Sequence, residues 1–492
     1  QPSHRECGWS FLSTNASATS TTSARSSPAR RPVVELLTRA DYDSVLVRTQ
    51  HPARGGSTTR ITPMPNPLEG IDQSNNPYIV VSSDTHAGLF VEDYREYLDS
   101  AVHTEFDEWL ATRHEHRAMV EEMNGEYVEQ WERENEIGLK GAYDPAIRDK
   151  TLDADGVAGE IIFADGDAVT GMESPPFGAG LSAGGITDPK LAWAGARAHN
   201  RWLEEFCATN PPRRAGVALV PITHGVDEAV KEIEALAGKP GIKGIMIPTM
   251  WHDNPSYGAD HYDPVWAACA EAGLVVHTHS GEADTPAYNE NMAQYMLEVA
   301  FWTHRPLWQL LLSGKFDKFP NLKYAPVECG SWWLGDLLFK TDSVFGGKNW
   351  KVKKMASRTK GLIQRLPSEY IGTNVFVGAS TMSKVELRRR YVNGVDALMW
   401  GTDYPHPEGS WPNTVERLQT DFQQIPVEET RLLLGLNAVR CYDLDLDGLT
   451  KIAADIGPTP ESLNQDISVR TPENAIREAR FWFDDYNIDW PE

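Results

Sequence analysis

The sequence predicts an α/β protein, and within that class a (β/α)8 barrel of the TIM type. From residue 78 onward, short apolar runs recur along the chain, and longer amphipathic segments separate most of them. We count eight such runs. Strands that alternate with helices form parallel sheets joined by right-handed crossovers. Eight units of this kind therefore indicate a closed barrel.

The expected strands cover residues 78–84, 157–164, 215–222, 242–249, 273–279, 322–328, 374–380 and 397–403. Between them, residues 225–238 and 262–273 have the apolar spacing of amphipathic helices. The charged stretch 106–135, after the first strand, predicts a helical insertion with a solvated face. Active sites of such barrels lie at the C-terminal ends of the strands, so the residues found there are the functional candidates.

The N-terminal part of the chain differs in composition from the rest. Residues 10–31 are rich in Ser, Thr and Ala and contain no acidic residue. Such a segment buries too little apolar surface to offset the entropy lost on ordering. We therefore expect a flexible, disordered low-complexity arm at 1–76 and the barrel domain over 77–492.

The overall charge and composition exclude several kinds of partner. The formal net charge is -24 and the pI is near 5.0, which disfavours binding to nucleic acid or to anionic membranes. No apolar run approaches the roughly 20 residues of a membrane-spanning helix. The five cysteines lack metal-type spacing and fit a reducing compartment. We expect a cytoplasmic homodimer that acts on a small molecule.

Possible metal ligands stand at the ends of four expected strands: Asp84 and His86 on the first, His277 and His279 on the fifth, Glu328 on the sixth, and Asp403 on the eighth. Because strand side chains alternate between faces, Asp84 and His86 share one face. A single residue of this kind is more often a turn or capping residue. Several carboxylates in one barrel mouth would be costly without a cation or hydrogen-bond partners, so the convergence predicts a metal site.

Four motifs carry a resemblance to a known family: "DTHAG" (84–88), "GLVVHTHSG" (273–281), "HRPLWQLLLSGKFDKFPNLKYAPVECGSWWL" (304–334) and "MWGTDYPHPEGSWP" (399–412). The chain after about residue 77 resembles the amidohydrolase-related branch of the amidohydrolase superfamily, which includes the aminocarboxymuconate semialdehyde decarboxylase-like enzymes. The resemblance implies that a divalent metal is bound by Asp84, His86, His279 and Asp403. It also implies that Asp403 takes a proton from metal-bound water. We expect one or two ions of zinc, iron or manganese.

Two positions depart from the family's pattern. The family commonly begins with His-x-His, whereas Asp84 takes the first position here and makes the site richer in oxygen. The decarboxylase-like members carry a proton-transferring histidine at the end of strand six, where this chain has Glu328. A carboxylate there would oppose binding of an anionic substrate unless it is protonated or metal-bound. In a hydrolase, Glu328 could bind a second ion or orient the attacking water.

These features lead us to expect a metal-dependent hydrolase that cleaves an ester, thioester or amide of a hydrophobic organic acid. Asp403 would act as the general base and Glu328 would assist. The alternative is non-oxidative decarboxylation of an aromatic or unsaturated carboxylic acid at the same metal. A non-catalytic binding protein is a third possibility, although binding alone does not require this set of ligands.

Three further histidines are secondary candidates. His304 lies on an expected apolar helix, where it is a buried hydrogen-bonding residue or a ligand. His406 follows Asp403 in a proline-bounded loop, where it would contact the substrate or the ligands. His277 lies one layer deeper than His279, which favours a core hydrogen bond. Four aromatic residues near the expected strand ends are candidates for an apolar substrate pocket: Trp251, Trp302, Trp332 and Phe163.

Overall fold

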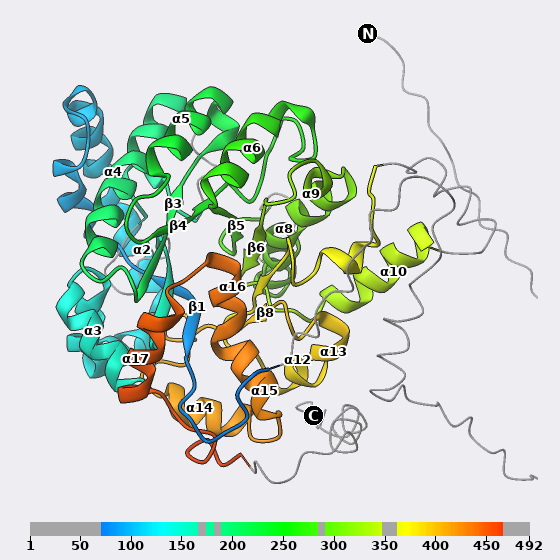
Figure 1. Cartoon of the computed structure of the whole chain (residues 1–492). Coiled ribbons are helices and arrows are strands. Elements are labelled where there is room, and N and C mark those ends of the chain that lie inside the picture. The colour runs from blue at the N-terminus through cyan, green and yellow to red at the C-terminus, as the bar shows by residue number, and fades with distance from the viewer. Residues whose placement is uncertain (1–69, 166–173, 182–187, 284–290, 347–361, 466–492) are drawn as a thin grey trace, which may run out of the picture. The chain divides into compact units, whose positions relative to one another are not determined.

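The computed structural model describes residues 70–465 (Figure 1), except for 166–173, 182–187, 284–290 and 347–361, and except for the side chains of 114–128 and 292. The arm expected at 1–76 lies outside the described residues as far as residue 69.

Eight parallel strands form one sheet in which each strand pairs with the next in the chain. They are β1 (Val81–His86), β2 (Gly159–Phe163), β3 (Arg214–Leu219), β4 (Ile242–Met246), β5 (Val275–His279), β6 (Tyr324–Val327), β7 (Val377–Gly378) and β8 (Leu398–Met399). Each falls within or overlaps its expected range. Thr85 and Tyr404 form a parallel bridge, and Ser83 N donates to Trp400 O at 2.9 Å. These contacts join the first and last strands and confirm the predicted (β/α)8 barrel.

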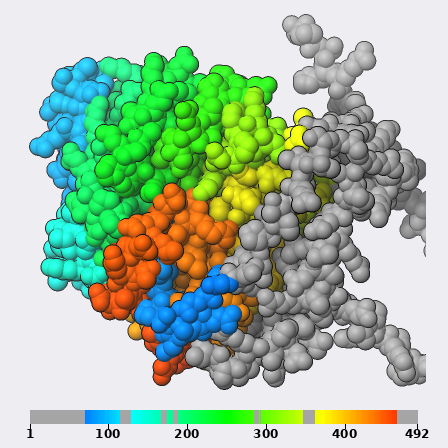
Figure 2. Space-filling view, viewed as in Figure 1, coloured from blue at the N-terminus to red at the C-terminus, as the bar shows by residue number. Residues whose placement is uncertain are grey.

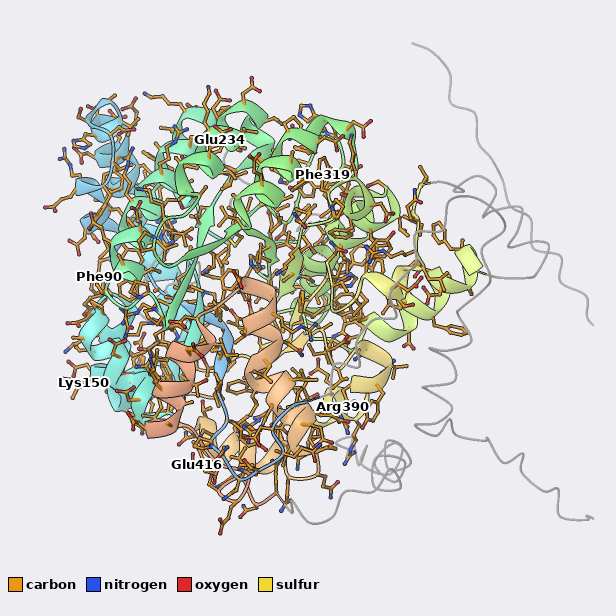
Figure 3. All side chains as sticks on the ribbon, in the orientation of Figure 1. Phe90, Lys150, Glu234, Phe319, Arg390 and Glu416 are labelled. Carbon is orange, nitrogen blue, oxygen red and sulfur yellow. The ribbon has the colours of Figure 1, made fainter. Side chains whose placement is uncertain are left out.

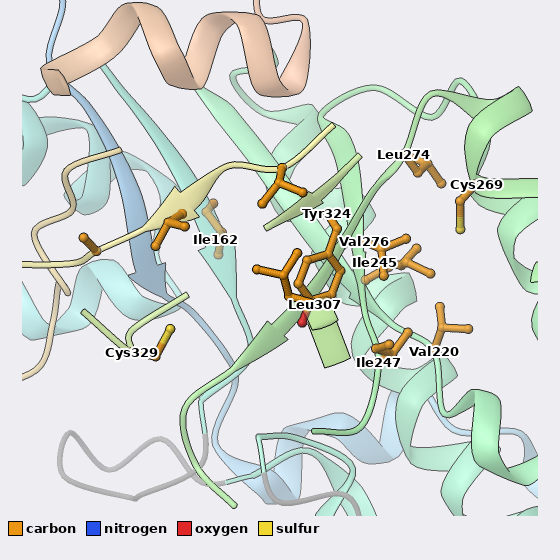
Figure 4. Packing of buried hydrophobic residues seen from close by; sticks show 14 of the residues in the cluster. Ile162, Val220, Ile245, Ile247, Cys269, Leu274, Val276, Leu307, Tyr324 and Cys329 are labelled. Carbon is orange, nitrogen blue, oxygen red and sulfur yellow. The ribbon is translucent and has the colours of Figure 1, made fainter. Parts of the chain in front are cut away.

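Most strands are rich in apolar residues because both of their faces are buried, whereas β1 and the end of β5 also bury polar side chains. On β5, Val275 belongs to the cluster inside the barrel, whereas the next residue, Val276, packs outward beneath the helices. Figure 4 shows Val276 in this outer cluster with Ile245 of β4 and Tyr324 of β6. Continuous apolar runs, rather than alternating ones, are therefore what this architecture requires.

Helices cover the barrel from outside (Figure 1). The larger ones are α2 (His103–Leu139), α3 (Pro145–Ala154), α4 (Pro189–Ala208), α5 (Val226–Leu236), α6 (Asp263–Ala272), α8 (Met292–Leu312), α10 (Leu334–Gly346), α14 (Thr414–Asp421) and α17 (Leu446–Ile456). Shorter ones are α9 (Lys315–Lys318), α12 (Lys384–Arg388), α13 (Arg390–Asn393), α15 (Val427–Arg431) and α16 (Asn437–Tyr442). α5 and α6 match the two expected helices, and α2 with α3 forms the expected insertion between β1 and β2. No helix in the described ranges is both long and apolar enough to cross a membrane.

The last helices pack against the first described residues. Figure 2 shows this segment, in blue, against the orange and red helices of the C-terminal part. Arg431 of α15 donates hydrogen bonds to the backbone oxygens of Asp72, Asn76 and Pro77 at 2.7–3.0 Å. Nearby, Arg390, labelled in Figure 3, forms a buried ion pair with Glu429 at 2.6 Å. The hydrogen bonds of Arg431 connect residues 72–77 to α15.

Candidate metal centre

The ends of β1 and β5 bring three potential ligands together. Asp84, His86 and His279 are all buried. Asp84 Oδ1 lies 3.1 Å from His279 Nε2 and 3.6 Å from His86 Nε2. One ligand atom of each residue lies within 4.8 Å of the others. The alternation of side chains along β1 thus places both of its polar residues at the same point inside the barrel mouth.

The loop after β8 completes the cluster. Asp403 Oδ1 lies 3.4 Å from His86 Nε2 and 3.3 Å from His406 Nδ1. The imidazole rings of His86 and His406 stack with centroids 4.2 Å apart. His86 therefore belongs to two candidate ligand groups, one with Asp84 and His279 and one with Asp403 and His406. The structure brings together the four residues that the family resemblance implies, and their role as ligands stays a prediction.

The donor atoms of this cluster fit a divalent cation. His86 Nε2 and Asp403 Oδ1 are buried, and neither has a hydrogen-bond partner among the described residues. Buried polar atoms without partners are costly, and a cation between them would remove that cost. Mixed imidazole and carboxylate ligands suit zinc, iron and manganese.

The backbone at this end of the barrel has an uncommon conformation. Glu328, Ser380 and Asp403 follow β6, β7 and β8, and their φ angles are 55°, 49° and 59°. A left-handed conformation is unusual for residues other than glycine, and it persists where surrounding contacts impose it, often at active sites. All three side chains reach the cluster, because Ser380 Oγ donates to Asp84 Oδ2 and Glu328 Oε2 lies 3.3 Å from His279 Nδ1.

The two catalytic carboxyl groups predicted from the sequence have opposite electrostatic environments. Burial and the nearby charge of Asp403 raise the pKa of Glu328 well above its ordinary value. Burial also opposes ionisation of Asp403, but His406 and His86 outweigh it and lower the pKa of Asp403. A protonated Glu328 does not repel an anionic substrate. The raised pKa of Glu328 weakens the expected objection to a decarboxylase.

Two residues of the cluster were not predicted from the sequence. Ser380 holds Asp84, and Asp165 Oδ1 lies 3.5 Å from His406 Nε2. Ser380 is the last residue of one expected strand, and Asp165 directly follows another. Their positions at strand ends were the only feature of the sequence that could have pointed to the site. Serine is not a typical metal ligand, and an aspartate after a strand is common in turns, so residue type alone did not single them out.

His277 and His304 lie outside the candidate ligand groups found among the described residues. His277 Nδ1 lies 2.9 Å from Ala325 O, and its ring stacks on Tyr442 deeper in the barrel. The ring of His304 stacks on Trp333 with centroids 4.0 Å apart, and its Nδ1 accepts a hydrogen bond from Trp308.

The four predicted pocket residues occupy different environments. Phe163 lies against His279, with ring centroids 4.8 Å apart. The rings of Trp251 and Trp302 pack against each other with centroids 5.7 Å apart, and Trp332 is 48% exposed. A small apolar pocket lies beside the ends of β3 and β4, and its described lining includes none of these four but does include Leu219, Met246 and Pro248.

A buried ion pair between α3 and β2 contacts the end of β1. Arg148 of α3 lies 2.7 Å from Glu160 of β2, and both side chains are fully buried. Arg148 also donates to the backbone oxygen of His86 at 2.9 Å, and Thr85 Oγ1 donates to Glu160 Oε2 at 3.2 Å. The pair therefore helps to hold the strand that carries Asp84 and His86.

The fold and this cluster define a metal-binding (β/α)8-barrel enzyme of the amidohydrolase superfamily. The chain belongs to the amidohydrolase family itself, because residues 174–444, more than half of its length, match the family model described as "Amidohydrolase". A comparison with curated protein sequences found no match.

Several solved structures share the fold. The 5-carboxyvanillate decarboxylase from Sphingomonas paucimobilis is 19% identical, with a TM-score of 0.52 over 76% of this chain and 100% of that chain. A 5-carboxyvanillate decarboxylase from Novosphingobium aromaticivorans, with bound manganese, is 18% identical, with a TM-score of 0.53 over 76% and 98%. A dihydroxybenzoic acid decarboxylase from Polaromonas sp. JS666, also with manganese, is 16% identical, with a TM-score of 0.51 over 76% and 99%.

These comparisons correct the expectation of hydrolysis. The three solved structures named above are decarboxylases of aromatic acids. The prediction that the enzyme cleaves an ester, thioester or amide is therefore wrong as the main assignment. The prediction took a carboxyl group at the end of β6 as evidence against a decarboxylase unless the group is protonated or metal-bound, and burial raises the pKa of Glu328.

Proposed function

We propose that this protein is a metal-dependent, non-oxidative decarboxylase of an aromatic or unsaturated carboxylic acid. The observation that carries the proposal is the grouping of Asp84, His86, His279 and Asp403 at the C-terminal end of the barrel, with Glu328 beside them. The decarboxylases that share the fold act on 5-carboxyvanillate and dihydroxybenzoic acid, which supports an aromatic substrate.

Asp84, His86, His279 and Asp403 would hold a divalent cation, and manganese is the ion bound in two of the similar structures. When bound, the cation supplies a positive charge that orients the substrate's oxygens and stabilises negative charge as the carbon–carbon bond breaks. The buried His86 and Asp403 side chains would hold this charge inside the protein, where charges interact more strongly than in bulk water.

In this proposal, Glu328 moves the proton. In decarboxylation the bond to the carboxylate carbon breaks, CO2 leaves, and the remaining carbon keeps the electron pair and binds a proton. The Glu328 side chain is 26% exposed at the mouth, whereas the side chains of Asp84, His86 and His279 are fully buried. Glu328 would hold that proton on a carboxyl oxygen and deliver it to the carbon. Phe163, packed on His279, offers an apolar surface for an aromatic ring.

A CO2-release assay tests the proposal. The manganese-loaded protein should release CO2 from members of a panel of hydroxybenzoates and carboxyvanillates. Chelation should abolish the release and added Mn²⁺ should restore it. Asp403→Asn should lower turnover by orders of magnitude, whereas Asp155→Asn, the same change at the opposite end of the barrel, should not. If the loaded protein releases no CO2 from any member, or if chelation has no effect, the proposal is wrong.

A further inference from the structure

Glu386 is a buried carboxylate that connects two loops at the barrel mouth. It lies on α12 and is 8% exposed. One of its oxygens, Oε1, accepts hydrogen bonds from the backbone N and the hydroxyl of Ser331, at 2.5 and 3.1 Å. The other, Oε2, accepts from the backbone N and the hydroxyl of Ser383, both at 3.0 Å. Four donors thus converge on one side chain.

The two loops carry residues of the candidate metal centre. Ser331 lies three residues after Glu328 at the end of β6, and Ser383 lies three residues after Ser380 at the end of β7. Glu328 and Ser380 both have left-handed backbones, with φ of 55° and 49°. Such conformations are unfavourable for residues other than glycine and require contacts that impose them. The hydrogen bonds of Glu386 are contacts of this kind, made a few residues away on each loop.

Glu386 does more than cap its own helix. Its bonds with Ser383 form a capping box at the start of α12, which is an ordinary helix-start device. A capping box involves only residues at the start of its own helix. Glu386 Oε1 instead accepts from Ser331, which lies on another loop, 55 residues away in the chain. Gly330 fits this arrangement, because a Cβ there would lie 3.1 Å from Glu386 Oε1 and 2.9 Å from Trp332. The loop after β6 therefore packs closely against the Glu386 carboxyl group and donates hydrogen bonds to it.

On the basis of the proposed function, we propose that Glu386 is a positioning residue for the cation site. By holding Ser331 and Ser383 it keeps Glu328 and Ser380 in their left-handed conformations. Ser380 then orients Asp84 by donating to Oδ2, which leaves Oδ1 facing His279 and His86. The residue acts through two loops and touches neither the cation nor the substrate.

Metal binding without substrate tests this role. Replacing Glu386 with Gln exchanges one carboxylate oxygen for an amide NH2 group, which cannot accept hydrogen bonds. Either Ser331 or Ser383 therefore loses its acceptor. The dissociation constant of Mn²⁺ should rise about 10-fold, at the lower end of the effect of losing an outer partner of a metal ligand. The visible absorption spectrum of the Co²⁺-loaded protein should change, because it reports the geometry of the ligands.

Asp445→Asn is the matched control. Asp445 caps α17 by accepting from Gly448 N at 3.0 Å. The backbone oxygen of nearby Asp443 accepts from Lys243 Nζ, near the start of β4 and away from the mouth. This variant makes the corresponding acid-to-amide change at a helix cap away from the mouth, and it should keep the Mn²⁺ affinity and the Co²⁺ spectrum of the wild type. If Glu386→Gln also keeps both, or if Asp445→Asn shifts both, the positioning role is overturned.

A second pair of variants covers the case in which Glu386→Gln does not fold. Ser331→Ala and Ser383→Ala each remove one hydroxyl donor and keep the backbone bond, so each should weaken Mn²⁺ binding by a smaller factor. Wild-type affinity in both would also overturn the role. Because Mn²⁺ and Co²⁺ are measured alone, these results do not depend on CO2 release. A wild type that binds metal but decarboxylates nothing would refute the proposed reaction and leave the role of Glu386 standing.

Discussion

Nε2 of His86 lies 3.4 Å from Oδ1 of Asp403, so the first and the last strands of the barrel meet at the candidate metal centre. Backbone contacts reinforce the meeting, because Asp403 N donates to Asp84 O at 3.0 Å and His86 N donates to Tyr404 O at 2.7 Å. The contacts that close the barrel therefore also bring the candidate ligands of the two strands together. Changes at this seam should affect metal binding directly.

Replacing Asp403 with Asn should remove most of the bound metal. The amide keeps the size of the side chain but loses the negative charge that faces His86 Nε2. The loss of affinity should exceed the roughly 10- to 100-fold that the loss of an outer partner costs, because a direct ligand is changed. Elemental analysis of the purified variant measures it. Asp155→Asn should keep the wild-type metal content, and full occupancy in Asp403→Asn would contradict the assignment of this residue as a ligand.

Replacing Glu160 with Gln should strongly destabilise the fold. Glu160 lies 2.7 Å from Arg148 and 3.7 Å from Arg214, and all three side chains are buried. Removing one partner of a buried ion pair costs about 3–5 kcal/mol because the remaining charge is uncompensated. Urea unfolding measures the loss. Glu136→Gln breaks an exposed pair with Lys140 and should cost less than about 1 kcal/mol. Equal losses in the two variants would show that the buried pair is not a major source of stability.

Asp155 should make stability depend on pH near neutrality. It is 4% exposed, and burial raises its pKa to about 7 from 3.8, although it accepts a hydrogen bond from Thr414 N. Between these pH values the folded protein holds a proton that the unfolded chain releases, so stability falls as pH rises through this window. The slope approaches about 1.4 kcal/mol per pH unit.

Asp155→Asn removes this titration and keeps an acceptor for Thr414. The melting temperature of the variant, relative to the wild type, should therefore rise from pH 5 to pH 8 and change little above it. Thermal melts at a series of pH values give this difference directly. A constant difference over the range would mean that Asp155 titrates at the same pH in the folded and unfolded states.

Two N-terminal deletions should differ in their effect. Deleting residues 1–69 should leave the melting temperature nearly unchanged, since this low-complexity composition adds little to a core. Deleting residues 1–76 should lower it, because Arg431 loses its acceptors on Asp72, Ser74 and Asn76, and hydrogen bonds to charged groups contribute about 1.5–3 kcal/mol each. Equal melting temperatures would show that these bonds add nothing, and would support the arm boundary predicted at residue 76.

The barrel could be predicted from the sequence because each strand can be recognised from its own short stretch of residues. The strands are buried on both faces, so most contain a short apolar run that can be recognised without its neighbours, as Val275 and Val276 can in β5. Alternation along a strand is also local, and it places Asp84 and His86 on one face before any partner is known. The family motifs then joined these two residues to His279 and Asp403.

What the sequence by itself determined is therefore the eight strands, their order and the polar residues at their ends. The tertiary structure alone decided which of those ends touch, and it added Ser380, Asp165 and Glu386 through contacts between loops far apart in the chain. It also determined the direction in which the surroundings shift the pKa of Glu328, because the pKa of a carboxyl group depends on its burial and on the charges around it. Neither property is present in a short stretch of sequence, and for that reason the chemistry of the site could be assigned only after the fold.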